Sequence, residues 1–150
     1  MYVSARLDYA LRALVVLPPP PGEPLTATQL ADDQEVSSTY LRTTLNELRA
    51  GGILVHERGP RGGYSLARPT ADITICDVLA ALRIPVVEVH PTPRSTDEFG
   101  RRLSTLWKHV DDSTAKLLSS ISVAHVAKGN GAKRIHDATM IHAVPRRADA

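Results

Sequence analysis

The sequence predicts a mainly α-helical fold with one small β-hairpin. Two short helix patterns follow one another between residues 26 and 50. Two short β-prone runs joined by a glycine-containing loop come next, at residues 53–69. A long heptad pattern occupies residues 99–121 of a chain of 150 residues. This length suits one compact domain, or a small domain with an appended dimerisation element.

The first helix is expected over residues 4–17, with Ser4 as its N-cap. The proline-rich stretch 18–24 ends it, because proline lacks the backbone N–H and restricts the residue before it. Four apolar side chains fall on one face at helical spacing and are expected to enter the core: Leu7, Leu11, Leu14 and Val15.

Capping boxes mark the starts of two further helices. Thr26, with a glutamine three residues later, predicts a short helix that ends near Asp33 or Gln34. Thr74, with an aspartate at the same spacing, predicts another over residues 74–83. Residues 84–98 contain several prolines and show no clear period, so we expect a loop there.

Between these helices, Ser37 is expected to cap a helix that stops at Gly51 and Gly52. Its apolar stripe follows the i, i+4, i+8 spacing and comprises Tyr40, Leu41, Thr44, Leu45 and Leu48. Its opposite face is polar and comprises Ser38, Thr39, Arg42, Thr43, Asn46 and Arg49. After it, the runs 53–58 and 64–69 are joined by the loop 59–63, which predicts a β-hairpin.

The last predicted element is the long helix. Its seam of about three heptads comprises Leu103, Trp107, Val110, Thr114, Leu117 and Ile121, a pattern typical of a dimerising helix. We therefore divide the chain into a helix-and-hairpin domain at 1–83, the loop 84–98, a dimerisation helix at 99–127 and a mobile tail at 128–150.

Composition excludes several classes of protein. No apolar run approaches the roughly 20 residues of a membrane span, and the N-terminus lacks a signal-peptide pattern, so we expect a cytoplasmic protein without membrane contact. A net charge of +2 does not by itself indicate nucleic-acid binding. The single cysteine, Cys76, excludes a disulfide within the chain.

Two short helices followed by a hairpin describe a winged helix-turn-helix, which offers its second helix to the DNA major groove. Hydroxyl and amide groups on the polar face of residues 37–50 can bond bases or phosphates, and Arg42 can donate two hydrogen bonds to guanine. A polar face that only meets solvent is an equally simple interpretation of that helix alone.

The hairpin loop favours the DNA-binding interpretation. Arg58, Arg61 and Arg68 bring positive charge to it, with Arg61 at the tip, and its glycines allow close approach to a phosphate or a narrow minor groove. A solvated turn is the simpler alternative. A nucleotide-binding loop is disfavoured, because residues 59–63 lack the GxxxxGK[ST] spacing and join two strands.

Four stretches identify a resemblance that covers about residues 1–125: LDYALRAL, VSSTYLRTTLNELRAGGIL, RGPRGGYSLARP and ITICDVLAAL. Together they resemble the Rrf2 family of bacterial transcription regulators, the group that contains IscR, NsrR and CymR. The resemblance implies a homodimeric winged-helix DNA-binding protein whose long helices pair. It implies recognition by Ser38, Tyr40 and Arg42, and wing contacts from Arg58, Arg61, Gly62, Gly63 and Tyr64.

The sequence departs from the family pattern in three places. Iron–sulfur members carry three cysteines in the loop before the long helix, whereas residues 86–107 contain none, so the usual thiolate ligands are missing. Arg101 and Ser104 stand where the last cysteine and a nearby histidine would fall. Arg42 replaces an acidic residue and Arg61 a common glycine, which indicates a different operator and a more cationic wing.

We expect no cofactor and no metal site. Cys76 lies in an apolar run, so a buried core residue is a simpler interpretation than a redox switch, although its place near a helix start keeps the switch open. The histidines form no helical metal-binding pair. An effector, either a small molecule or a protein, is left open, with residues 84–100 as one place for it.

Three functions follow in order of support. The first is a dimeric, sequence-specific DNA-binding regulator, expected to be a repressor, on double-stranded DNA with a palindromic operator. The alternative is a protein-interaction module that acts through the long helix and residues 84–100. An enzyme is disfavoured, because the sequence contains no GxSxG, HExxH, CxxC or phosphate-binding motif.

Overall fold

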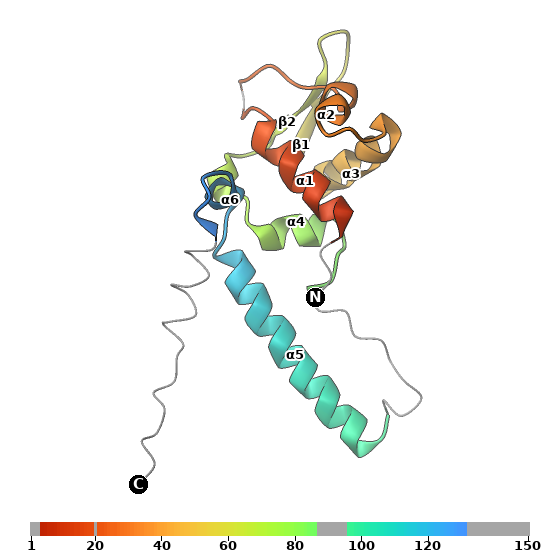
Figure 1. Cartoon of the computed structure of the whole chain (residues 1–150), viewed down its shortest axis with the longest axis vertical. Coiled ribbons are helices and arrows are strands. Elements are labelled where there is room, and N and C mark those ends of the chain that lie inside the picture. The colour runs from red at the N-terminus through yellow and green to blue at the C-terminus, as the bar shows by residue number, and fades with distance from the viewer. Residues whose placement is uncertain (1–3, 20, 87–95, 132–150) are drawn as a thin grey trace.

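The computed structural model describes residues 4–19, 21–86 and 96–131 (Figure 1). Most of the expected loop 84–98 and of the expected tail 128–150 lies outside these ranges. The described elements are α1 (Ala5–Val16), α2 (Ala27–Asp33), α3 (Ser38–Ala50), β1 (Leu54–Glu57), β2 (Gly63–Leu66), the 3₁₀ helix η1 (Thr70–Asp72), α4 (Ile75–Ala81), α5 (Glu98–Ser119) and α6 (Val123–Ala127). No helix among the described residues is long and apolar enough to span a membrane.

The side-chain caps expected at Ser4, Thr26 and Thr74 are confirmed, and the one expected at Ser37 is wrong. The hydroxyl of Thr26 accepts from the backbone N–H of Gln29 at 3.2 Å, and the Gln29 amide oxygen accepts from the Thr26 N–H at 2.8 Å. Thr74 and Asp77 form the same pair of bonds at 3.1 and 2.9 Å. Ser4 caps α1, whereas the side chain of Ser37 makes no capping bond to α3.

Two residues expected to face the core, Val15 and Tyr40, are exposed. Val15 is 43 % exposed, because α1 turns Ala10 and Ala13 inward, and these small side chains let neighbouring helices approach closely. Tyr40 is 42 % exposed, because Leu41, one residue further along α3, occupies the core position. The expected leucines of α3 are in the core, as are Leu7 and Leu14 of α1, whereas Leu11 is only partly buried against it. The core also contains Ile53, Leu54 and Leu66.

The hairpin is confirmed, and its two strands differ in burial. β1 pairs with β2 in antiparallel register from Leu54 opposite Leu66 to Glu57 opposite Gly63. The other edge of β2 is bridged by Leu25, whose N–H and C=O bond the C=O and N–H of Tyr64 at 2.9 and 2.7 Å. All four residues of β2 are therefore buried, while β1 is buried only at Leu54.

The segment 99–127, expected as the dimerisation helix, forms two helices. α5 ends at Ser119, and Ser122 starts α6 with a capping box to His125. Ile121, between them, is 3 % exposed in the core, and its C=O accepts from the Ile75 N–H at 2.9 Å. Ile121 is thus not part of the helical seam. α5 extends away from the body, at the end opposite the hairpin (Figure 1).

Replacing Gly63 with alanine is expected to destabilise the domain. The added Cβ would lie 2.6 Å from the Leu25 carbonyl oxygen, so the Leu25–Tyr64 bridge would have to separate. Overpacking of this kind costs roughly 1–3 kcal/mol, measurable by chemical denaturation. Gly131→Ala is the control, because the nearest atom to its Cβ, Val126 Cγ2, lies 3.9 Å away. Equal stability of the two variants would contradict the assigned backbone contact.

Candidate DNA-binding interface

The outward face of α3 presents polar and cationic groups. Leu41, Leu45 and Leu48 bury the opposite side of the helix, which fixes the direction in which the polar residues point. Ser38 is partly exposed, and five further residues on this face are exposed: Thr39, Arg42, Thr43, Asn46 and Arg49. Because Ser37 does not cap the helix, the first-turn N–H groups of α3 are free of that side chain and favour an anion.

The hairpin tip is a tight, exposed turn. Residues 58–61 are exposed, Gly59 adopts a φ of 111°, and the Gly62 N–H donates to the Gly59 carbonyl at 2.9 Å. A Cβ on Gly62 would lie 2.2 Å from the Glu57 carbonyl oxygen, so this glycine allows the turn to close. The glycines therefore set the projection of Arg58 and Arg61 into solvent.

Two residues expected to make wing contacts, Gly63 and Tyr64, are buried in this structure. Gly63 is buried against Leu25, and Tyr64 is only 4 % exposed, because both edges of β2 are covered. The Tyr64 ring lies edge-on to His56 with centroids 4.7 Å apart, and its hydroxyl donates to the Asn46 Oδ1 at 3.1 Å. In the loop between the strands, residues 58–61 are therefore exposed and Gly62 is partly exposed, and residues 55–57 of β1 are exposed as well.

Arg68 is at the base of the hairpin and not at its tip. Its Nε donates to the Asp72 carbonyl at 2.9 Å, one terminal nitrogen donates to the Gly52 carbonyl at 3.2 Å, and the other lies 3.3 Å from an Asp77 carboxylate oxygen. Burial raises the pKa of Asp77, but the bonds from Thr74 and the charge of Arg68 outweigh it and leave the pKa below its ordinary value. Arg68 thus anchors the wing to η1 and α4.

Arginines on α3 and the hairpin tip differ from most others in their pairing. Arg6 pairs with Glu47, Arg12 with Asp8 and Arg102 with Glu98. Four guanidinium groups form no hydrogen bond or ion pair within the described residues of this surface, namely those of Arg42, Arg49, Arg58 and Arg61. Arg83, which follows α4 and lies outside this surface, also has no partner among the described residues. The α3 face and the tip can therefore attract phosphate without first breaking an ion pair.

Other parts of the described chain offer a different chemistry. An open cleft of about 710 Å³ is formed by α1, the α2–α3 turn and α6, and none of the expected DNA contacts lines it. Its charged groups are Asp8, Asp33, Glu35 and Arg12, so carboxylates outnumber cations and phosphate is disfavoured.

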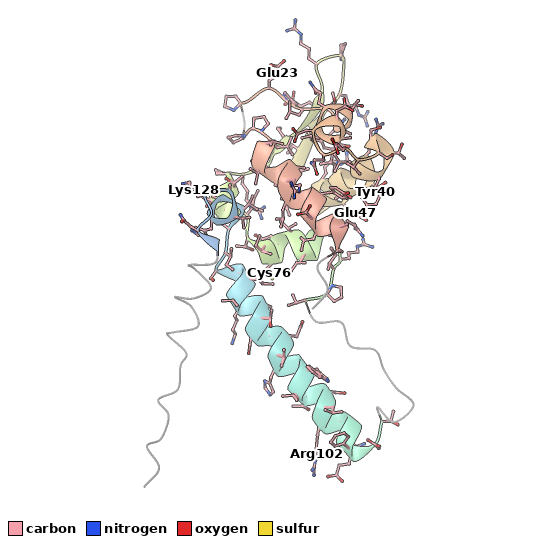
Figure 2. All side chains as sticks on the ribbon, in the orientation of Figure 1. Glu23, Tyr40, Glu47, Cys76, Arg102 and Lys128 are labelled. Carbon is pink, nitrogen blue, oxygen red and sulfur yellow. The ribbon has the colours of Figure 1, made fainter. Side chains whose placement is uncertain are left out.

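Cys76 is a partly exposed free thiol on α4, near the junction with α5 (Figure 2). No group of three or more His, Cys, Asp or Glu side chains in the described ranges is placed to hold a metal ion.

A short helix pair whose second helix is polar outward, followed by a hairpin with an unpaired cationic tip, defines a winged helix-turn-helix DNA-binding protein. Residues 3–129 match the family described as "Rrf2: Iron-dependent Transcriptional regulator". The chain belongs to the Rrf2 family of transcription regulators.

Individual relatives agree with this membership. The chain is 28 % identical over 137 residues to the HTH-type transcriptional regulator IscR of Vibrio atlanticus, which covers 90 % of this chain and 75 % of that protein. It is 31 % identical over 133 residues to a Mycobacterium tuberculosis protein named as an HTH-type transcriptional regulator, covering 86 % and 83 %. The solved structure of CymR, the global cysteine regulator of B. subtilis, superposes with a TM-score of 0.66 at 25 % identity, covering 85 % of this chain and 97 % of that one.

Proposed function

We propose that this chain is a homodimeric, sequence-specific repressor in the cytoplasm, and that it binds a palindromic operator. Each subunit would place α3 in a major groove and residues 58–62 on the adjacent backbone or minor groove. The observation that carries this proposal is the set of arginines on α3 and at the wing tip that have no partner among the described residues. Bound DNA would supply the anions that these side chains lack, and an occupied promoter would exclude the polymerase.

The proposed contacts divide into base reading and phosphate binding. Arg42 and Asn46 lie one turn apart on the outward face of α3 and are assigned to bases. Ser38, Thr39 and Thr43 are assigned to phosphates or base edges. Tyr40 is assigned to a hydroxyl contact, and its ring packs edge-on against Tyr9. Arg58 and Arg61 are assigned to the backbone or the minor groove.

A gel-shift series tests these assignments. Arg42→Ala is expected to cost roughly 1–3 kcal/mol and to relax preference at one base pair, because it removes a directional contact to guanine. Arg61→Ala is expected to weaken all sequences alike and to lower the salt slope by about 1, because it removes a phosphate contact.

Arg102→Ala is the matched control, since it removes the same charge at the far end of α5 (Figure 2). Full binding by both Arg42→Ala and Arg61→Ala would reject the proposed contacts. Genome-wide occupancy without an enriched motif, together with a stable protein partner, would favour the interaction module over the regulator.

The proposed dimer uses the apolar seam of α5. Leu103, Thr114 and Leu117 on this seam are partly buried in the single chain, while Trp107 is 41 % and Val110 37 % exposed. Leu106 and Phe99 add further exposed apolar area to the helix, at 52 % and 68 %. A second copy that covers these side chains would remove their apolar surface from water, which is the main driving force for association.

Trp107→Glu is expected to convert the dimer to a monomer, because it places a charge in the centre of the seam. Analytical ultracentrifugation would report the change in mass, and binding to a two-half-site operator would weaken in parallel. Thr105→Glu introduces the same charge on the opposite side of the helix and should leave the dimer intact. A monomeric wild-type protein at micromolar concentration would contradict the proposed seam.

The iron–sulfur cluster of some family members does not fit this chain. Such clusters are held mainly by several cysteine thiolates, and this sequence has one cysteine, on α4. We propose that the regulator senses its signal without a cysteine-ligated cluster, through an effector that is either a small molecule or a protein. Residues 87–95, within the segment 84–100 expected to contact it, lie outside the described part of the chain.

Anaerobically purified protein is therefore expected to absorb in the ultraviolet, through its aromatic residues, and to show no band in the visible range. Iron and sulfide analysis of the same sample should give none in stoichiometric amount. A cysteine-rich family member purified in parallel provides the positive control. Visible bands that disappear in air would overturn the proposed cluster-free sensing.

A further inference from the structure

The hydrogen bond between Tyr64 and Asn46 joins the wing to the outward face of α3. The two residues are 18 positions apart, and the Tyr64 hydroxyl donates to the Asn46 Oδ1 at 3.1 Å. Tyr64 is held at three points: its backbone is bonded twice to Leu25, its ring packs against His56, and its hydroxyl reaches Asn46. The buried Tyr64 side chain thus holds its hydroxyl in place as a donor to the exposed Asn46 side chain.

This bond changes what Asn46 offers to DNA. A free asparagine amide presents a donor and an acceptor together, the pair that matches adenine in the major groove. In Asn46 the acceptor oxygen already receives the Tyr64 hydroxyl, whereas the amide nitrogen has no hydrogen-bond partner in the described residues. Because the terminal torsion of asparagine is broad, an external bond of this kind decides which end of the amide faces outward.

We propose that Tyr64 is a positioning residue for specificity, and that it makes Asn46 read base acceptors. The Asn46 NH₂ group would donate to guanine O6 or N7, or to thymine O4, and would disfavour cytosine, whose N4 is itself a donor. Tyr64 acts only through Asn46, because its ring is buried. This inference rests on the proposed insertion of α3 into the major groove.

The experiment measures dissociation constants for an operator and its single-base variants, at every position of the half-site. Wild-type protein is expected to discriminate against cytosine at one position by about 5- to 150-fold, the range for a directional base contact. Tyr64→Phe removes only the hydroxyl and keeps the ring. It should reduce that discrimination to the level of Asn46→Ala and leave the other positions and the salt slope unchanged.

Two further variants make the result decisive. The double variant Tyr64→Phe with Asn46→Ala should equal Asn46→Ala alone, because the tyrosine acts through the asparagine. Asn46→Asp keeps an acceptor for Tyr64 but loses the outward donors, so its preference should move toward cytosine. This variant changes only an exposed side chain, and it tests the assigned donor even if Tyr64→Phe does not fold.

The outcomes separate this inference from the function on which it rests. Wild-type protein with no sequence preference would reject the proposed function itself. A wild-type motif whose discrimination survives in Tyr64→Phe, with the thermal unfolding midpoint unchanged, would overturn the positioning role of Tyr64. Uniform weakening of all operators by Tyr64→Phe would also overturn it, because a purely structural defect has that effect.

Discussion

The DNA-binding half of this protein depends on the close approach between β2 and the chain just before α2. Two backbone hydrogen bonds join Tyr64 to Leu25, and Gly63 leaves no room for a side chain where the two backbones meet. Since Leu25 directly precedes the N-cap of α2, this contact fixes the hairpin to the helix-turn-helix. The hairpin and α3, the helix proposed to read DNA, are consequently held in one packed body.

The arginines fall into two groups, those paired inside the fold and those facing solvent. Arg68 is used internally, where it satisfies two carbonyl groups and a carboxylate at the base of the hairpin. Arg6 similarly joins α1 to Glu47 of α3 and to the Leu82 carbonyl. The arginines of the wing tip and of the outward α3 face lack such partners among the described residues, so a small net charge of +2 still yields a locally cationic surface.

Local signals in the sequence predicted most elements, because capping boxes and turn glycines act within a few residues. The starts of α2 and α4 and the position of the β-hairpin were predicted from such local signals. Two of the failures concern long-range contacts. The sequence predicts that Tyr64 is an exposed wing residue, but Leu25 pairs with the second edge of β2 and helps to bury it. Ile121 fits the heptad pattern, but in the structure it lies in the core and its backbone bonds to Ile75. Neither partner is near in sequence, so periodicity alone could not reveal them.

The return of the chain after α5 has a mechanical consequence. Ile121 and Val123 are buried in the body, and bonds from Ile75 to Ile121 and from Val123 to Ile73 fasten the end of α5 to the segment that begins α4. α4 also packs against α5, and α6 packs against α1 and η1. In the proposed dimer, a displacement of α5 by a partner subunit or an effector would therefore be passed to α1 and α4 through these packed side chains. Such a route would require no cluster, which agrees with the cluster-free sensing proposed for a chain with one cysteine.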